Sequence, residues 1–334
     1  MTEMRHIINH LTSHKTLSSN EAHQILSDIA KGKYSEIEMA SFLTVYLMRS
    51  ITVEELSGFR DALLEHCLRV DLNQNNIIDL CGTGGDGKDT FNISTLASFV
   101  AAGAGAKVAK HGNYGVSSSC GSSNILEYFG YKFTNNQNNL REQIEKAGIC
   151  FLHAPLFNPA MKNVAPIRKN LRVKTFFNML GPMVNPAFPQ KQLVGVFSLD
   201  LARLYGYIYQ QSNKDFTIVH SLDGYDEISL TGAFKAISNK SENIFYPEDL
   251  GVDTIKPNEI VGGKTVHESA VIFQNILEGK GNAAQQSVVE VNAAFALQSY
   301  LNNDFNESMA LAKESINSGK ALASFKKLIE ISQT

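Results

Sequence analysis

The stretch at 82–90 holds the residue types that bind phosphate, with four glycines in six positions and two aspartates, Asp86 and Asp89. It follows an apolar run at 77–81 that predicts a strand, and it precedes a helical pattern that starts near Ser94. Glycines let backbone N–H groups approach phosphate oxygens, and a helix N-terminus adds partial positive charge. The stretch therefore predicts a site for a phosphate-bearing ligand.

Three interpretations of this stretch compete. Gly82, Gly84 and Gly87 match the dinucleotide pattern G-x-G-x-x-G, but the next predicted strand does not end at the acidic residue that would hold a ribose hydroxyl. Gly82, Gly87 and Lys88 match the start of a nucleotide triphosphatase loop, in which a hydroxyl residue and not Asp89 should follow the lysine. The third interpretation is a tight turn that binds no ligand, but such a turn needs only one or two glycines.

A more specific pattern is GTGGD at 82–86, followed by N-x-S-T at 92–95 and KHGN at 110–113. In this order the segments resemble the signatures of the anthranilate phosphoribosyltransferases. The resemblance continues in collinear order over nearly the whole chain, through Ser117-Ser118, Gly121-Ser122, Asn158 to Lys162, Pro166 to Arg168, Phe177 to Pro182, Asn185-Pro186, His220-Ser221 and Gly224 to Glu227. One such segment would be weak support, but all of them together do not agree by chance.

The resemblance implies an enzyme that moves the phosphoribosyl group of 5-phosphoribosyl 1-pyrophosphate to the amino group of anthranilate and releases pyrophosphate, the second step of tryptophan biosynthesis from chorismate. Lys110 would bring a point charge to phosphate, whereas His111 fits either the site or a core position. By resemblance, the donor is bound by Gly82, Gly85, Asp86, Thr90, Asn92, Ile93, Ser94, Thr95, Lys110, His111, Gly112, Asn113, Tyr114, Gly115, Val116, Ser117, Ser118 and Ser122.

An acidic pair, Asp226 and Glu227, follows a predicted strand at 216–219. An isolated Asp-Glu pair is usually a solvated turn, but sheets of the α/β class place their sites after the carboxyl ends of strands. The resemblance implies that the pair binds Mg²⁺, two ions in all, with the Ser94 hydroxyl completing one site. Oxygen ligands and few carboxylates are what Mg²⁺ prefers when it is bound to substrate phosphates.

The acceptor carries a carboxylate and therefore needs a cation. By resemblance Arg168 meets that carboxylate, Asn113 contacts the amine side, and Gly82 lies close to both substrates. Alternatively, Arg168 is one member of a basic surface run. Two positions depart from the family pattern, because Tyr114 replaces the usual Arg and Asn158 the usual His. No general base is predicted, since an aryl amine is neutral at pH 7.

These residues must be positioned by two kinds of structure. Apolar residues recur at helical spacing up to about residue 70, and Ser35 with Glu38 and Thr52 with Glu55 form capping boxes. From residue 76, apolar runs at 77–81, 107–109, 149–152, 193–197 and 216–219 alternate with helical patterns, and the chain is helical again after 282. We expect a small all-helical N-terminal domain and a larger α/β domain with a mostly parallel central sheet.

The expected domain boundaries follow from these patterns. Residues 1–72 form the helical domain, which part of the basic, Pro-containing segment 161–189 rejoins. Residues 73–160 and 190–334 form the α/β domain that binds the donor.

The 334 residues include 30 basic and 33 acidic side chains, a net charge of −3 that gives no field to attract nucleic acid. The four cysteines lie far apart, which predicts neither a disulfide framework nor a zinc site. We expect no signal peptide, no membrane segment and a cytoplasmic location. The resemblance adds a homodimer. The alternative functions are a non-catalytic nucleic-acid-binding relative of the same fold and a nucleotide triphosphatase.

Overall fold

The computed structural model describes residues 3–115 and 119–334. They fall into two compact units, the first formed by Met1–Arg69 with Ala154–Pro186 and the second by Val70–His153 with Ala187–Thr334. The segment that rejoins the first unit begins at Ala154, earlier than the 161 expected. The reason is that strand β3 ends at His153 and the chain enters a short helix directly, where the Phe157 carbonyl accepts a hydrogen bond from the Leu68 N–H.

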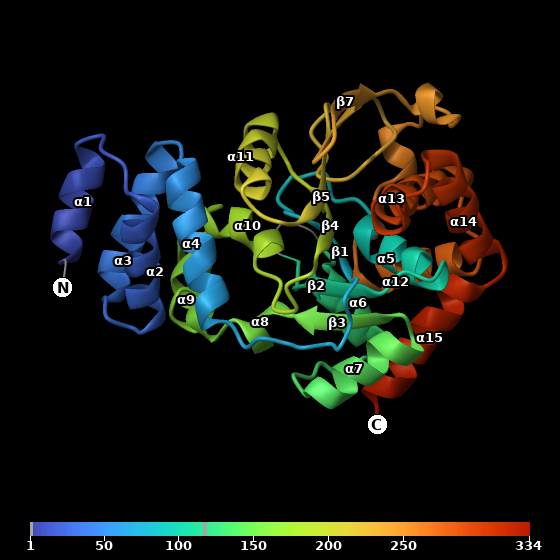
Figure 1. The fold of residues 1–334 in the computed structure, drawn as a ribbon, viewed down its shortest axis with the longest axis horizontal. Helices are drawn as coiled ribbons and strands as arrows, with labels where there is room; N and C mark the ends of the chain where they lie inside the picture. Colours follow the sequence, from blue (N-terminus) through green and yellow to red (C-terminus); the bar gives the residue numbers. More distant parts are fainter. Residues whose placement is uncertain (1–2, 116–118) are drawn as a thin grey trace. The chain divides into compact units, whose positions relative to one another are not determined.

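The first unit is all helical (Figure 1). The predicted capping boxes are confirmed at Ser35 with Glu38 and at Thr52 with Glu55. The helices are α1 (Met4–Thr12), α2 (Ser19–Ala30), α3 (Glu36–Met48), α4 (Val53–His66), α8 (Ala154–Phe157), α9 (Ala165–Leu171) and α10 (Phe177–Leu180), with 3₁₀ turns η1 (Pro159–Asn163) and η2 (Gly181–Met183).

Aromatic packing joins the two segments of this unit. Phe176, from the second segment, stacks on Phe59 of α4 at 4.5 Å between ring centroids and meets Phe42 of α3 edge to face at 6.1 Å. All three rings are buried. The second segment is therefore part of the core of the helical unit, since rings of this size dominate the apolar area that a small core buries.

One buried carboxylate, Glu55, ties three elements of the helical unit together. Its side chain is fully buried, pairs with Arg49, and accepts hydrogen bonds from the Leu17 N–H and the Tyr46 hydroxyl as well as from the cap residue Thr52. Burial alone would raise the pKa of Glu55, but the Arg49 guanidinium and the backbone donors outweigh it and lower the pKa. The capping glutamate thus also acts as an anchor within the core.

Glu55→Ala should lower the free energy of unfolding by about 3 kcal/mol, because it removes a buried carboxylate and leaves its donors on Arg49, Leu17 and Tyr46 without that partner. Urea unfolding followed by circular dichroism measures this change. The neighbouring exposed residue gives the control, since Glu54→Ala should change stability by less than about 0.5 kcal/mol. Equal changes in the free energy of unfolding for Glu55→Ala and Glu54→Ala would show that the Glu55–Arg49 pair contributes nothing to stability beyond the cap.

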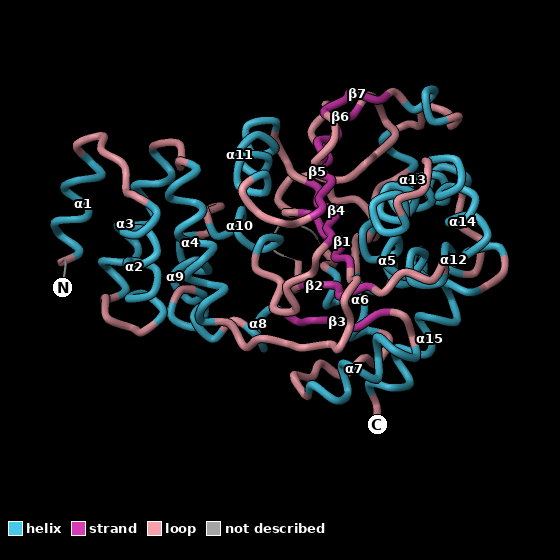
Figure 2. Tube along the Cα trace, viewed as in Figure 1, coloured by secondary structure: helices cyan, strands magenta, loops and turns pink. Residues whose placement is uncertain are grey.

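The second unit is built on a seven-stranded sheet (Figure 2). Its order is β3-β2-β1-β4-β5-β6-β7, with parallel pairing from β3 to β5 and antiparallel pairing for the last two strands. The strands are β1 (Ile78–Gly82), β2 (Val108–Gly112), β3 (Ile149–His153), β4 (Lys191–Gly195), β5 (Asp215–Ser221), β6 (Phe234–Ser238) and β7 (Glu242–Phe245). The predicted fold class, a helical N-terminal part and a mostly parallel sheet, is confirmed.

Helices cover both faces of this sheet (Figure 1). Helices α5 and α13 pack on one face and α11 on the other. The remaining helices complete the core around α5 and α13 or flank β3. The helices are α5 (Ile93–Gly103), α6 (Ser122–Tyr128), α7 (Gln137–Lys146), α11 (Leu199–Gln210), α12 (Val266–Leu277), α13 (Ala283–Leu301), α14 (Phe305–Asn317) and α15 (Lys320–Ser332), with 3₁₀ turns η3 (Pro247–Leu250) and η4 (Pro257–Glu259).

The order of the strands determines where a ligand can bind. From β1 the chain passes to β2 and β3 on one side, then returns to β4 on the other. In open α/β sheets, ligands bind outside the carboxyl ends of the strands at such a switch point.

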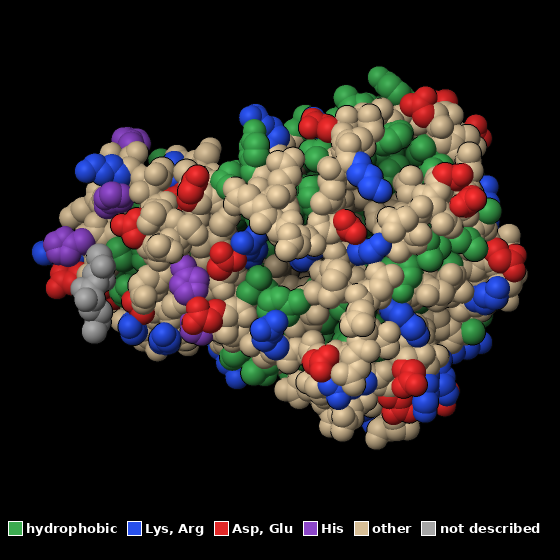
Figure 3. All heavy atoms as spheres, viewed as in Figure 1, with side chains coloured by type: hydrophobic (Ala, Val, Ile, Leu, Met, Phe, Trp, Pro, Cys, Tyr) green, Lys and Arg blue, Asp and Glu red, His purple; other side chains and the backbone are tan. Residues whose placement is uncertain are grey.

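Among the described residues, no helix is both long and apolar enough to cross a membrane. Acidic and basic side chains are interspersed on the face shown in Figure 3.

Candidate active site

The sheet register brings the predicted site segments together at one edge. Gly82 at the end of β1 pairs with Gly195 at the end of β4, and Gly112 ends β2 beside His153. The acidic pair follows β5, which is parallel to β4 and ends at Ser221. Because these strands are parallel, their carboxyl ends and the loops that follow share the same edge.

The glycines of the turn after β1 serve two different purposes. Gly84, Gly85 and Gly87 have φ of +66°, +80° and +75°, which side chains rarely allow. Gly82 instead permits a close approach, because a Cβ there would lie 2.5 Å from Oδ2 of Asp226. The Gly84 N–H donates to that same oxygen at 2.6 Å. The turn is thus shaped around the Asp226 carboxylate.

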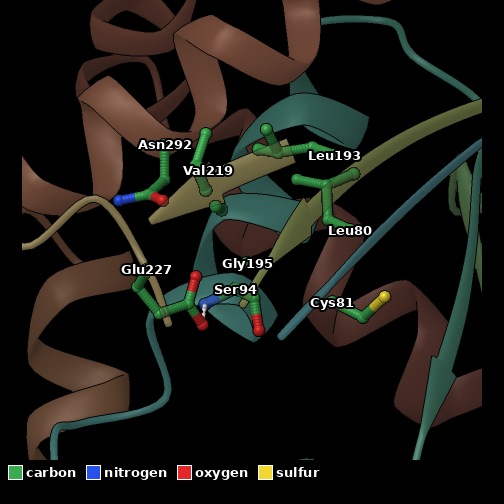
Figure 4. A pocket seen from close by; sticks show the side chains of 9 residues that line it. Leu80, Cys81, Ser94, Leu193, Gly195, Val219, Glu227 and Asn292 are labelled. Carbon is green, nitrogen blue, oxygen red and sulfur yellow. Dashed lines mark hydrogen bonds between the residues drawn. The ribbon is translucent and has the colours of Figure 1, made fainter. Parts of the chain in front are cut away.

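Three carboxylates gather at this point. The Asp226 N–H donates to Asp86 Oδ2 at 3.4 Å, and the Ser94 N–H donates to Glu227 Oε1 at 3.3 Å (Figure 4). Burial raises the pKa of Asp226 well above its usual range, and the charges of Glu227 and Asp86 add to this shift. Burial also raises the pKa of Glu227, although Lys110 and Ser94 act against it. The site therefore holds more negative charge than its own donors neutralise.

This charge fits a divalent cation that brings other ligands with it. Within residues 3–115 and 119–334, no group of three or more His, Cys, Asp and Glu side chains is arranged to hold a metal ion by itself. Mg²⁺ commonly takes one or two carboxylates and completes its octahedron with water and substrate phosphates. The donor chemistry of Asp226, Glu227 and the Ser94 hydroxyl matches that pattern.

The side chain of Lys110 lies beneath the site rather than at its surface. It is buried, and its Nζ donates to the Leu80 carbonyl at 2.6 Å and lies 3.5 Å from the Ser94 hydroxyl. Burial lowers the pKa of Lys110, while the charges of Asp79, Cys81 and Glu227 oppose the shift. That Lys110 brings its charge to a phosphate stays a prediction. In this structure its Nζ contacts the Leu80 carbonyl and the Ser94 hydroxyl, and its charge acts on Ser94 and Glu227 from below.

His111, the next residue of β2, is also buried, and its N–H donates to Asp79 Oδ1 at 3.2 Å. The loop after β2 folds back on the start of α6. The Asn113 carbonyl accepts from the Ser123 N–H at 3.1 Å and the Ser122 hydroxyl at 3.3 Å, and the Gly115 N–H donates to Asn124. A Cβ on Gly112 would meet the Ser122 hydroxyl at 2.3 Å. The predicted residues Val116, Ser117 and Ser118 lie outside the described residues.

The start of α5 presents its N-terminus to the same edge. Asn92 precedes the helix but does not cap it, because its side chain donates to the Cys120 carbonyl at 2.9 Å. The helix begins at Ile93, so the N–H groups of Ser94 and Thr95 belong to its first turn. Thr90 forms a bridge with Val261, a contact that sequence patterns did not predict. The predicted donor residues of this segment therefore lie around one helix N-terminus.

Arg168 belongs to the helical unit and differs from its basic neighbours. Its Nη2 donates to Asn178 Oδ1 at 3.2 Å, and its guanidinium lies 5.4 Å from the centroid of the Phe177 ring. Burial lowers the pKa of Arg168. Lys169 and Arg172 are exposed. Arg168 is thus held in a fixed position, unlike a member of a solvated basic run.

Several residues at this edge were missed by sequence reasoning. Thr83 places a buried hydroxyl without a hydrogen-bond partner among the described residues. Gly195 and Asn292 line a small pocket with Ser94 and Glu227 (Figure 4). In the helical unit, Asn158, a departure from the family pattern in the sequence analysis, has a buried Oδ1 that also has no partner within the described chain. A buried polar atom without a partner marks a candidate binding residue. The sequence does not reveal such an atom, because it does not show which atoms are buried.

Comparison with known proteins gives matches over both units. A model of the glycosyl transferase family, a/b domain, matches residues 74–322, and one of the glycosyl transferase family, helical bundle domain, matches residues 5–67. The chain is 62% identical over 330 residues to the anthranilate phosphoribosyltransferase of Christiangramia forsetii, covering 99% of this chain and 100% of that protein. It is also 62% identical to the Flavobacterium johnsoniae protein of that name, over 98% of this chain and 100% of the relative.

Solved structures give the same result. The crystal structure of anthranilate phosphoribosyltransferase from Thermus thermophilus matches with a TM-score of 0.91 at 30% identity, covering 98% of this chain and 99% of that one. The enzyme from Saccharomyces cerevisiae, in complex with phosphoribosyl pyrophosphate and Mg, matches with a TM-score of 0.91 at 28% identity, covering 99% and 98%.

A buried histidine borders the predicted donor loop. His153 Nδ1 lies 2.8 Å from the Ser123 hydroxyl, and its ring stacks on Phe133 at 4.2 Å and meets Tyr114 at 5.0 Å. Burial lowers the pKa of His153 to about 4; the Glu127 charge opposes this shift and His111 adds to it. Tyr114, the other departure from the family pattern, also donates to Glu127 at 3.1 Å. The packing therefore favours the neutral form of the imidazole.

The folded protein should lose stability as the pH falls from about 6.5 to about 4, because the unfolded chain then binds a proton that folded His153 excludes. A shift of this size corresponds to about 3 kcal/mol in all. His153→Gln should flatten the dependence of the free energy of unfolding on pH across this window, measured by urea titration at each pH. The exposed His267→Gln gives the control, and a slope unchanged by His153→Gln would contradict the assignment.

Proposed function

Because this chain belongs to the glycosyl transferase family that includes the anthranilate phosphoribosyltransferases, we propose that its site is built for the reaction of those relatives. The chain transfers the phosphoribosyl group of 5-phosphoribosyl 1-pyrophosphate to the amino group of anthranilate, and it releases N-(5-phosphoribosyl)anthranilate and pyrophosphate. This is the second step of tryptophan biosynthesis from chorismate. The observation that best supports the proposal is the Asp226 carboxylate held against the glycine turn by the Gly84 N–H at 2.6 Å.

The donor binds at the carboxyl edge of the sheet. The glycine turn and the first turn of α5 would surround its phosphates, and the Thr83 hydroxyl offers a donor. Asn113, Tyr114, Gly115 and Ser122 would contact the remaining phosphate and ribose oxygens. The predicted donor residues of the described chain fit this role, with Lys110 acting on Ser94 and Glu227 from below.

Asp226, Glu227 and the Ser94 hydroxyl would hold Mg²⁺, which is also present in the structure of the yeast relative with phosphoribosyl pyrophosphate. The family resemblance implies two ions in all. When bound, Mg²⁺ stabilises the charge that develops on the leaving pyrophosphate. The bond from ribose C1 to pyrophosphate breaks as the ring gains oxocarbenium character. The anthranilate nitrogen then bonds to C1, and its surplus proton passes to water or to the released pyrophosphate. Oriented N–H donors of this chain stabilise the same developing charge.

Arg168 would pair with the anthranilate carboxylate, and Asn113 and Gly82 would contact the acceptor on the donor side. The support for Arg168 is its fixed position beside Asn178 and Phe177, which an exposed basic residue would lack. Asn158 would offer its partnerless Oδ1 to the acceptor. No strong base is required, because the aryl amine attacks as a neutral nucleophile.

The two compact units are, in this proposal, the two domains of the enzyme. The chain would act as a homodimer, an expectation from the family resemblance. A cytoplasmic location fits the four cysteines, all of which are free.

The direct experiment mixes the protein, Mg²⁺, phosphoribosyl pyrophosphate and anthranilate, and follows the loss of anthranilate fluorescence. A loss of anthranilate fluorescence that requires the protein, Mg²⁺ and both substrates supports the proposal. Nucleotide triphosphatase activity is tested in parallel by phosphate release from ATP without anthranilate. ATP turnover with no consumption of anthranilate would replace the proposed function with that alternative.

Replacing both Asp226 and Glu227 by Ala should reduce turnover at least about a hundredfold, because the charge on the leaving pyrophosphate would no longer be balanced through Mg²⁺. The matched control is the exposed acidic pair Glu248 and Asp249 of the same unit, replaced in the same way. Both double variants are assayed over a range of Mg²⁺ concentrations, with thermal unfolding to verify the fold. Unchanged turnover of the first variant at limiting Mg²⁺ would remove the metal role.

Arg168→Ala should raise the KM for anthranilate about thirtyfold, which corresponds to about 2 kcal/mol for a lost charge-assisted hydrogen bond, and should change the KM for the donor far less. Arg168→Lys should recover only part of this loss, because an ammonium cannot reproduce the planar fork of the guanidinium. The exposed Lys169→Ala is the control on the same helix. Normal Michaelis constants for both Arg168 variants would place acceptor recognition elsewhere.

A further inference from the structure

The turn that carries the acidic pair is fixed in part by residues outside every predicted motif, Gly195 and Asn292. We call residues 221–229 the acid turn. At its base, the Ser221 hydroxyl donates to the Glu227 carbonyl at 2.7 Å. On the side of β4, the Asp226 carbonyl lies so close to Gly195 that a Cβ there would be 1.5 Å away. The third contact comes from α13, through Asn292.

The Asn292 amide binds both polar groups of one backbone unit. Its Nδ2 donates to the Ile228 carbonyl at 2.8 Å, and its Oδ1 accepts from the Ile228 N–H at 3.2 Å. Nδ2 also donates to the Val288 carbonyl of its own helix at 2.8 Å. One side chain thus fixes the backbone of the residue directly after Glu227 from both sides.

The surroundings of Asn292 show that this amide is not there for packing. It is 1% exposed, and every other buried residue of α13 is apolar. A buried amide costs free energy unless its polar atoms are hydrogen-bonded, and an apolar residue would satisfy the same core. Within the described residues, the side-chain hydrogen bonds of Asn292 go to the acid turn or to Val288. Asn292 also lines the pocket that Ser94 and Glu227 share (Figure 4).

We propose that Asn292 is a positioning residue that holds the acid turn so that the Asp226 and Glu227 carboxylates face the glycine turn and Ser94. The part of this inference that concerns Mg²⁺ rests on the proposed function. Asn292 does not touch substrate or metal; it acts through the Ile228 backbone. Since carboxylates that repel one another separate when their backbone is free, the hold of Asn292 keeps both available to one cation–phosphate complex.

The test compares Asn292→Leu with a matched variant, Gln143→Leu. Gln143 is also a fully buried amide on a helix, and its Oε1 accepts from the Phe151 N–H at 3.4 Å and from the Tyr131 hydroxyl at 2.8 Å, away from the acid turn. Hydrogen–deuterium exchange of the peptide 222–231 is measured in the whole protein without metal or substrate. Asn292→Leu should speed its exchange at least about tenfold, and Gln143→Leu should leave it unchanged.

A second readout is calorimetric binding of phosphoribosyl pyrophosphate at increasing Mg²⁺. Asn292→Leu should raise the Mg²⁺ concentration for half-maximal binding at least about tenfold, whereas Gln143→Leu should not. If Asn292→Leu does not fold, Asn292→Ala, which adds no bulk to the core, takes both measurements. Exchange of 222–231 at the wild-type rate, or an equal increase in the Gln143 variant, would overturn the proposal. If the wild-type protein consumes no anthranilate, the proposed function fails, while the exchange measurement still decides the role of Asn292.

Discussion

The contact on which the site depends is the approach of the Asp226 backbone to the end of β4. A Cβ at Gly195 would clash with the Asp226 backbone, and a Cβ at Gly82, its register partner at the end of β1, would displace the Asp226 carboxylate. These two positions let the turn after β5 reach across β4 to the turn after β1. The Gly84 N–H then meets the Asp226 carboxylate. Any side chain at either position would push the acidic pair away from the phosphate-binding turn.

The cost of this arrangement is electrostatic. Burial and the charges of neighbouring carboxylates, Asp86 among them, raise the pKa values of Asp226 and Glu227, so their charged forms are disfavoured in the protein alone. Lys110 opposes this from below Glu227, but it is itself buried, and its pKa is lowered. When the donor binds together with its cation, the cation supplies the missing positive charge. Backbone N–H donors balance the negative charge of the phosphates. Active and binding sites commonly hold charged groups whose ionised form is unfavourable until a ligand binds.

Sequence patterns predicted most of the fold but not its far edge. The strands β1 to β5 are mostly buried, apolar runs, which is the signal of a parallel sheet. The antiparallel strands β6 and β7 were missed, because β7 is four residues long and largely exposed, so no apolar run marks it. The caps at Ser35 and Thr52 were found because a capping box is local in sequence.

The site was predictable where its residues form local motifs. The glycine turn and the acidic pair were found this way, and the structure brings them together. The roles of Gly195 and Asn292 depend on contacts with residues far along the chain, which no local pattern encodes. For Asn292, the available signal in the sequence was a lone Asn among the apolar residues of α13. The contacts of the Lys110 side chain with Leu80 and Ser94 were not predicted, because spacing does not tell which way a strand residue at a switch point points.

The central claim is that the buried acidic pair requires a cation before the donor's phosphates can bind beside it. Calorimetric titration of the wild-type protein with phosphoribosyl pyrophosphate, with Mg²⁺ and then with the metal chelated, tests this claim most directly. Binding should be strong with Mg²⁺ and weaker by at least about a hundredfold without it, because pyrophosphate would then face Asp226, Glu227 and Asp86 without compensation. Equal affinity in both conditions would contradict the account.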